Sequence, residues 1–211
     1  MRRTWIAASV VLGIVGGWLA FDLAGPPAAR GNATQPPTGK TGGPPSGQSC
    51  AQCHNAGVND GTGLLQFLRD SGSYVPGNTY AIVILLGRTG NTRWGFEVTA
   101  LKQDGTMAGS FANVTDLTTI QSSGSIDYVS HVIGISDGTF AGTANAAGWG
   151  FEWTAPAAGA GTVTFYVAGV AADNDDSDNG DYTFTTTDTW PEGGTTAVET
   201  TTWGRIKQIY R

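Results

Sequence analysis

Two cysteines and a histidine stand together in the motif Cys50-Ala51-Gln52-Cys53-His54. The chain has no other cysteine and only one other histidine, His131. Four chemistries use two cysteines at this spacing: disulfide exchange, a structural disulfide, a zinc site, and covalent attachment of haem. The rest of the sequence has to decide between them.

Three of these chemistries fit the chain poorly. A disulfide-exchange site normally begins a helix in a βαβ unit, where the helix dipole lowers the thiol pKa, and no βαβ pattern surrounds the motif. A disulfide between Cys50 and Cys53 would close a very short loop, so it would remove little entropy from the unfolded chain. Zinc prefers four ligands, and beyond the motif only His131 remains to complete the set.

Covalent haem accounts for every chemical group of the motif. Each thiol adds to one vinyl group, and the residue after Cys53 is then placed where its imidazole can ligate the iron. The motif resembles the haem-attachment site of c-type cytochromes. This resemblance implies haem c bound through Cys50 and Cys53, with His54 as an axial ligand. It covers the motif alone, because the helices of a cytochrome c domain are not apparent in the sequence.

Iron held by His54 has a sixth position, which electron-transfer sites usually close with histidine or methionine. Beyond the N-terminal leader, the chain offers His131 and Met107. We predict His131 as the second axial ligand, because it follows a predicted strand at 126–130 whose rim could meet the motif. Met107, an external ligand and an open position are the alternatives, and His131 could instead serve the β-domain itself.

An acidic run at 173–181 lies between two predicted strands. Closely spaced carboxylates with a glycine could bind Ca²⁺. The candidate calcium ligands are Asp173, Asp175, Asp178 and Asp181. The alternative is a solvated polar loop, because Asp, Asn and Gly favour turns.

The N-terminus has the layout of a secretory signal peptide. Two arginines precede an uncharged apolar run at 5–21, and small residues follow. We predict a leader at 1–24; the alternative is an uncleaved N-terminal anchor, which would be the protein's contact with a membrane. The protein is therefore expected in the periplasm, in the cell envelope or outside the cell, which suits haem c because it is attached after export. Residues 25–48 are rich in Pro and Gly and predict a flexible or polyproline-like tether to the motif segment at 49–61.

Beyond residue 62 the sequence predicts short strands joined by glycine-containing turns. The chain has 32 glycines and is only 13% charged, a composition that disfavours a helical bundle. We predict an all-β fold, an antiparallel immunoglobulin-like β-sandwich at 62–187, followed by a threonine-rich tail at 188–211. The predicted strands lie at 64–69, 79–86, 93–101, 126–130, 149–154, 162–169 and 181–187.

Two of these stretches carry more specific expectations. Residues 64–69 are ambiguous between a strand and one helical turn, and 79–86 are apolar on both faces, as expected of a central strand.

The tail is expected to be extended, with its last residues docked; the alternative is a sorting or partner-binding tag. The predicted core aromatics are Trp94, Phe96, Trp149, Phe151, Trp153 and Phe165.

The β-domain also carries a set of motifs, which are Tyr74-Val75-Pro76-Gly77-Asn78-Thr79-Tyr80, Arg93-Trp94-Gly95-Phe96-Glu97-Val98-Thr99-Ala100, Tyr128-Val129-Ser130-His131, Trp149-Gly150-Phe151-Glu152-Trp153-Thr154-Ala155-Pro156, Gly161-Thr162-Val163-Thr164-Phe165-Tyr166 and Gly180-Asp181-Tyr182. Together they resemble the reeler (reelin N-terminal-like) domain of bacterial secreted proteins. The resemblance implies an immunoglobulin-like sandwich outside the cytoplasm and no catalytic activity. Bacterial members similarly carry a Cys-x-x-Cys-His segment just upstream.

Three function classes follow. The leading hypothesis is an exported mono-haem protein that transfers single electrons to an unidentified redox partner. The alternative is a non-catalytic binding or adhesion module with an unidentified cell-surface ligand. An enzyme with an open haem position that acts on peroxide or a small ligand is the third class. No Ser/His/Asp triad is assembled, because His54 and His131 are the only histidines and His54 belongs to the motif. The formal net charge of −6 and the lack of a Lys/Arg cluster argue against nucleic acid as a partner.

Overall fold

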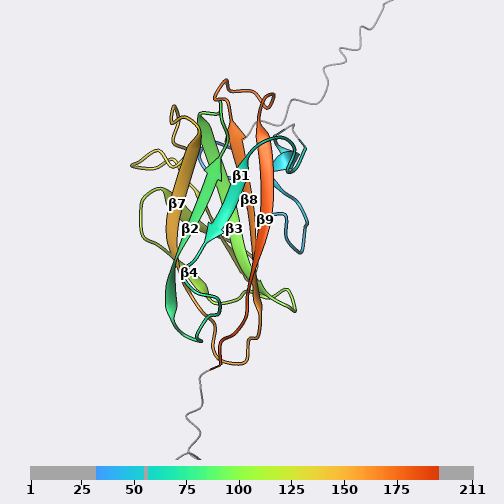
Figure 1. Cartoon of the computed structure of the whole chain (residues 1–211), viewed down its shortest axis with the longest axis vertical. Coiled ribbons are helices and arrows are strands. Elements are labelled where there is room, and N and C mark those ends of the chain that lie inside the picture. Colours follow the sequence, from blue (N-terminus) through green and yellow to red (C-terminus); the bar gives the residue numbers. More distant parts are fainter. Residues whose placement is uncertain (1–31, 55–56, 195–211) are drawn as a thin grey trace, which may run out of the picture.

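The computed structural model describes residues 32–54 and 57–194. Within these ranges the chain forms one short 3₁₀ helix, η1, and nine strands (Figure 1). Their bounds are η1 Cys50–Gln52, β1 Leu64–Leu68, β2 Thr79–Gly87, β3 Arg93–Lys102, β4 Ser110–Asn113, β5 Thr118–Ser123, β6 Ile126–His131, β7 Ala146–Thr154, β8 Val163–Ala172 and β9 Tyr182–Trp190.

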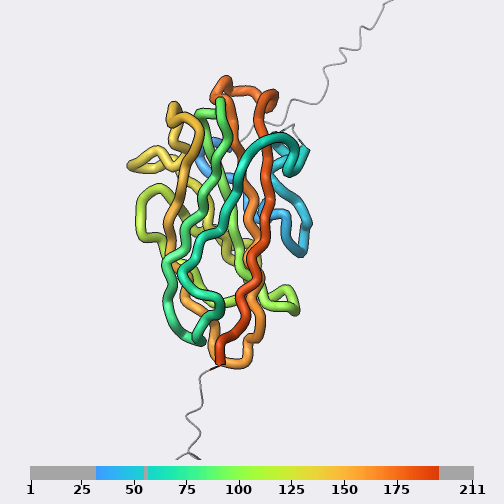
Figure 2. The backbone as a smooth tube through the Cα atoms, in the orientation of Figure 1, coloured from blue at the N-terminus to red at the C-terminus, as the bar shows by residue number. Residues whose placement is uncertain are grey.

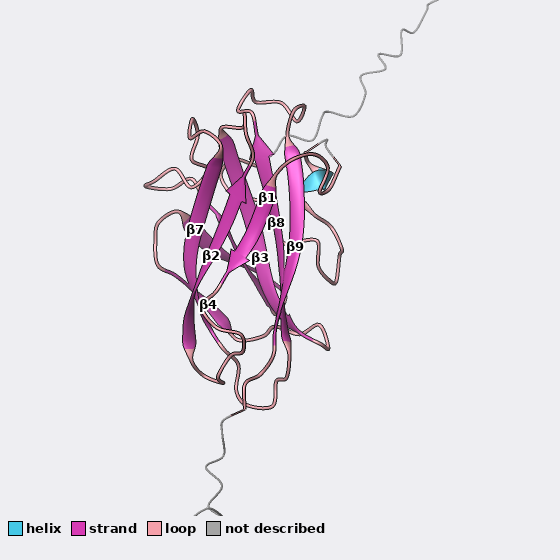
Figure 3. Ribbon diagram, viewed as in Figure 1, coloured by secondary structure: helices cyan, strands magenta, loops and turns pink. Residues whose placement is uncertain are grey.

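The strands form two antiparallel sheets that face each other. A four-stranded sheet has the order β1-β2-β7-β4, and a five-stranded sheet has the order β5-β6-β3-β8-β9. Figure 3 shows the two layers, with the strands of both running along the length of the molecule. The predicted all-β antiparallel sandwich is therefore confirmed, and the stretch left ambiguous at 64–69 is a strand, β1.

Alternating aromatic side chains fill the space between the sheets. On β7, Trp149, Phe151 and Trp153 all face the core, and each is at most 1% exposed. All six predicted core aromatics are buried, which confirms the interpretation of their period-two spacing. The core extends further than predicted, because Trp190 stacks on Trp153 with ring centres 5.4 Å apart. The sandwich therefore runs past the predicted boundary at 187 to the end of β9.

β2 is a central strand, as expected, because it lies between β1 and β7 in the four-stranded sheet. Its two faces nevertheless differ in burial. One face is buried, as Ile82 and Ile84 show, but Val83 and Leu85 on the other face are 36% and 37% exposed. The β1 residues Leu64 and Leu68 are exposed as well, and Leu68 pairs with Val83 in the register. The outer face of the four-stranded sheet is therefore apolar and open to solvent.

The Pro/Gly-rich segment was predicted to be a tether, and the structure differs from this prediction. Its described part, 32–48, packs on the five-stranded sheet, and Figure 2 shows this blue segment running beside the sandwich. Thr41 forms a bridge with Ser49 and is 2% exposed. A side chain at Gly43 would overlap the Tyr166 ring, so only glycine allows this close approach. Glycine at this position allows close packing. The composition of the segment is typical of a linker, but its described part is docked on the sheet.

Two predicted terminal segments lie wholly or mostly outside the residues that the structure describes. The leader or anchor at 1–24 lies outside the described residues, and so do residues 195–211 of the predicted tail. The first residues after β9 are docked, because the Glu192 carboxylate accepts hydrogen bonds from the Gly159 and Gly161 N–H groups. Among the described residues, no helix is both long and apolar enough to cross a membrane.

The aromatic core predicts a large stability difference between two truncations. Trp153→Ala should lower the free energy of unfolding by about 3–5 kcal/mol, because it leaves a cavity among packed rings. Leu64→Ala, at a side chain that is 52% exposed, is the matched control and should change it by less than about 1 kcal/mol. Urea unfolding followed by circular dichroism measures both; similar losses in the two variants would show that the core assignment is wrong.

Candidate functional site

The Cys-x-x-Cys-His motif forms a single hydrogen-bonded turn. Ser49 caps η1, since its hydroxyl accepts a hydrogen bond from the Ala51 N–H. The Cys53 and His54 N–H groups both donate to the Cys50 carbonyl oxygen, at 3.1 Å each. Both cysteines are half-buried free thiols. The turn therefore presents two unpaired thiols and places His54 directly after them, beside β8 and β9 (Figure 3).

His54 is held by a buried carboxylate from a distant part of the chain. Its Nδ1 lies 2.5 Å from Oδ2 of Asp181, the residue just before β9. A carboxylate only accepts hydrogen bonds, so Nδ1 carries a proton and donates a hydrogen bond to Asp181. The side chains of His54 and Asp181 are 16% and 2% exposed. No hydrogen bond to Nε2 of His54 is formed by the described residues, which leaves this nitrogen available as a ligand.

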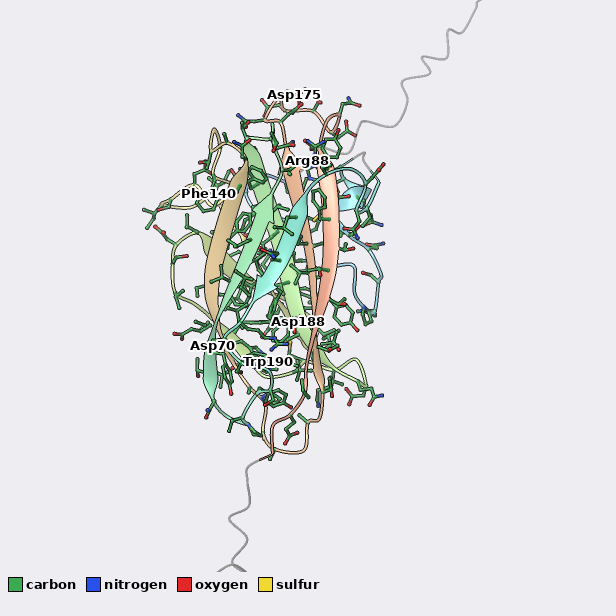
Figure 4. All side chains as sticks on the ribbon, viewed as in Figure 1. Asp70, Arg88, Phe140, Asp175, Asp188 and Trp190 are labelled. Atoms are coloured by element: carbon green, nitrogen blue, oxygen red, sulfur yellow. The ribbon has the colours of Figure 1, made fainter. Side chains whose placement is uncertain are left out.

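Asp181, one of the four predicted calcium ligands, contacts His54 in the structure. Asp173 and Asp175 accept hydrogen bonds from backbone N–H groups two residues further on, as polar turns do. Figure 4 labels Asp175 in this loop, at one end of the sandwich. No group of three or more His, Cys, Asp or Glu residues within 32–54 and 57–194 is arranged to hold a metal ion. Calcium binding that includes Asp178 stays a prediction from composition.

His131 is buried, with 6% of its surface exposed, and both ring nitrogens have neighbours. Nδ1 accepts a hydrogen bond from the Phe96 N–H at 3.1 Å, and Nε2 lies 3.3 Å from the Asn32 carbonyl oxygen. Burial lowers the pKa of His131, so the ring is neutral and its Nε2–H donates to Asn32. A Cβ at position 95 would lie 2.8 Å from the ring, so Gly95 gives the imidazole its space.

A cavity of about 360 Å³ brings the two histidines together. His54, His131 and Asp181 all line it, together with Arg93 and Thr139. A smaller neighbouring cavity is lined by both cysteines and both histidines. The structure thus brings together the predicted thiols and imidazoles, which lie far apart in the sequence.

Met107, the alternative axial ligand, is not part of this arrangement. It follows β3 and forms a bridge with Leu101, near the C-terminal end of that strand. The cavity lies at the other end of β3, where Arg93 and Gly95 line it. Six residues of extended chain separate Gly95 from Leu101, which is about 20 Å.

The chemistry of the donor set fits haem c. Two free thiols lie one turn apart, one imidazole has an unused Nε2, and a second neutral imidazole lies on the same cavity. Asp181 adds the carboxylate partner that metal-bound histidines commonly have. Cys50, Cys53 and His54 are the residues that would hold the group.

Sequence reasoning missed Glu97, which lies beneath the motif segment. Its side chain is completely buried, Oε2 accepts the Lys40 N–H, and Oε1 has no hydrogen-bond partner among the described residues. Burial raises the pKa of Glu97 to about 7. Burial, followed by the Glu97 charge, raises the pKa of the Cys50 thiol to about 12, so this thiol is protonated at neutral pH. The only sequence signal was a glutamate on the polar face of a predicted strand, which usually indicates exposure.

Comparisons with known proteins give similarity in fold. No family model and no curated protein matches the chain. The crystal structure of the human F-spondin reeler domain (fragment 1) has 19% identity and a TM-score of 0.44, over 61% of this chain and 89% of that one. A type II cohesin domain from the cellulosome of Acetivibrio cellulolyticus has 10% identity and a TM-score of 0.35, over 62% and 95%. The strand pairing itself establishes the sandwich, and these likenesses carry no argument about ligand or activity.

Glu97 predicts a pH dependence of stability. The pKa of this carboxyl is about 7 in the folded chain against 4.5 for the free group, so the folded state binds the proton more tightly. The free energy of unfolding should therefore fall between pH 5 and pH 8, by at most about 3 kcal/mol. Glu97→Gln should lose most of this fall, and Glu152→Gln on the outer face of β7 should keep it. Urea unfolding at both pH values measures the effect; an equal fall in both variants would contradict the role of Glu97.

Proposed function

We propose that this protein is an exported mono-haem c-type protein that transfers single electrons. Haem is attached to Cys50 and Cys53, and His54 ligates the iron. The observation that carries the proposal is the state of the His54 ring: Nδ1 is hydrogen-bonded to Asp181, and Nε2, beside two unpaired thiols, has no hydrogen-bond partner among residues 32–54 and 57–194. When bound, haem supplies an iron that cycles between ferric and ferrous states.

The chain's own residues fix the position of the donors. The η1 turn sets the spacing of the two thiols, and the Lys40 N–H bonded to Glu97 ties the segment that precedes the motif to β3. Asp181 sets which nitrogen of His54 faces the cavity. A rigid donor set suits electron transfer, since little rearrangement then accompanies a change of iron charge.

His131 remains our candidate for the second axial ligand, ahead of Met107, because it lines the same cavity as His54. Ligation through Nε2 requires loss of the hydrogen bond to the Asn32 carbonyl and a proton on Nδ1 instead. A protonated Nδ1 no longer accepts the hydrogen bond from the Phe96 N–H, but the Phe96 carbonyl oxygen, 3.3 Å from Nδ1, is in place to accept a hydrogen bond from it. The change of tautomer therefore exchanges one hydrogen bond to Phe96 on β3 for another.

A second candidate function is a non-catalytic binding module, in which the motif is structural or incidental. The outer face of the four-stranded sheet favours it, because Leu64, Leu68, Val83 and Leu85 are all at least 36% exposed there. Contiguous exposed apolar side chains often mark an interaction surface. This candidate predicts a protein that works without haem, so the test of haem attachment separates the two functions.

Haem attachment is tested by producing the full chain with a c-type haem maturation system. The intact mass of the wild-type protein should rise by one haem, and the denatured protein should stain for haem on a gel. Cys53→Ala should form at most one thioether and retain haem poorly, whereas Ala51→Ser, in the same turn, should behave as wild type. A wild-type mass that equals the bare polypeptide would reject the proposal and favour the binding module.

The axial role of His131 is tested by absorption spectroscopy of the haem-loaded protein. The wild type should give a low-spin spectrum typical of two histidine ligands, and His131→Ala should turn it high-spin because a strong ligand is lost. Met107→Leu is the control and should leave the spectrum unchanged. If the His131→Ala spectrum equals that of the wild type, His131 is not an iron ligand.

A further inference from the structure

We infer that Asp181 is a positioning residue for the iron ligand: its carboxylate fixes the ring of His54 through Nδ1 and lowers the reduction potential of the haem iron. The inference rests on the proposed function, because it concerns the same iron site. It assigns to Asp181 a role different from the calcium ligation predicted from the sequence.

The contact between His54 and Asp181 is built into the backbone. After the motif, the chain turns back along the start of β9: the Asn59 N–H donates to the Thr183 carbonyl oxygen at 2.9 Å, and Val58 forms a parallel bridge with Thr183. The Thr183 hydroxyl donates to the Gly57 carbonyl oxygen at 3.1 Å. These bonds join the segment that follows His54 to the strand that follows Asp181. The pair is therefore held by secondary structure on both sides and does not depend on two free loops meeting.

The burial of Asp181 points to a ligand rather than to a role in folding. Its side chain is 2% exposed, and Oδ1 has no hydrogen-bond partner among the described residues. The residue lines the cavity that His54 also lines. A buried carboxylate with one unpartnered oxygen costs stability, so a packed apolar side chain would serve the fold better. The other oxygen of this carboxylate, Oδ2, accepts a hydrogen bond from the Nδ1–H of His54.

The chemical consequence follows from the charge of the carboxylate. A carboxylate that accepts the Nδ1–H makes Nε2 a more basic ligand. A more basic, more negative ligand stabilises ferric iron over ferrous iron, so the reduction potential falls. Asparagine at 181 keeps the size and one acceptor oxygen but removes the charge. Alanine removes both, and the ring of His54 is then free to choose its tautomer.

The first test measures the midpoint potential of the haem-loaded full chain by redox titration. Asp181→Asn should keep covalent haem and shift the potential in the positive direction. Asp178→Asn is the matched control, because it removes the same charge from the same loop and Asp178 makes no hydrogen bond to His54. A shift in Asp181→Asn that is no larger than the shift in Asp178→Asn would overturn the inference, since it would reflect general charge alone.

The second test does not need haem. The chain has only two histidines, so ¹⁵N NMR of the unloaded full chain resolves the ring nitrogens of each. His54 should carry its proton on Nδ1 in the wild type and in Asp178→Asn, and should lose this preference in Asp181→Ala. A proton on Nε2 of His54 in the wild type would overturn the positioning role. Absence of covalent haem would instead reject the proposed function and the effect on potential, while the NMR result would still decide whether Asp181 positions His54.

Discussion

The packing of aromatic rings between the two sheets is the constraint on which the rest of the molecule depends. Trp153 on β7 contacts Trp190 on β9, and its ring also lies edge-on to Phe165 on β8, with centres 5.0 Å apart. These contacts join one sheet to the other at Trp190, and the pairing of β9 with β8 carries the register from Trp190 back to Tyr182. Because Asp181 directly precedes β9, the same packing that closes the core also places the carboxylate of the candidate site.

The two outer faces of the sandwich differ in their chemistry. The five-stranded sheet is covered by the segment that carries the motif, and this cover buries polar groups such as Glu97 and His131. The four-stranded sheet leaves apolar side chains such as Val83 and Leu85 in contact with solvent. The candidate haem site and a candidate interaction surface thus lie on opposite sides of one core. They can be altered separately, since no described strand contributes to both sheets.

The covered face explains why polar residues in the strands need not be exposed. Glu97 alternates with core residues along β3 and would face water in a bare sandwich. The docked segment removes that water and supplies the Lys40 N–H in its place. The buried Glu97 carboxyl has one oxygen without a partner among the described residues, and its pKa is raised. The segment that covers it should therefore bind the sheet more weakly as the pH rises and Glu97 loses its proton.

Local pattern determined much of this protein. The alternation of aromatic and polar residues was sufficient to predict seven of the nine described strands, the sandwich and the core, because a period of two places alternate side chains on opposite faces whatever the topology. The short strands β4 and β5 were not predicted. The spacing of Cys50, Cys53 and His54 was sufficient to predict that their side chains lie close together, because nearby residues in one turn stay together in any fold. The composition of 25–48 misled, since glycine serves close packing as well as flexibility.

Only the tertiary structure decided which distant groups meet. His54 and Asp181 are 127 residues apart, and no local signal pairs them; the bridge between Val58 and Thr183 does. The burial of Glu97 and the exposure of Leu85 could not be predicted from the sequence either. The sequence of a strand indicates which residues share a face, but it does not indicate what covers that face. Long-range contacts depend on the order of strands in the sheets, and that order is a property of the whole chain's packing rather than of any segment.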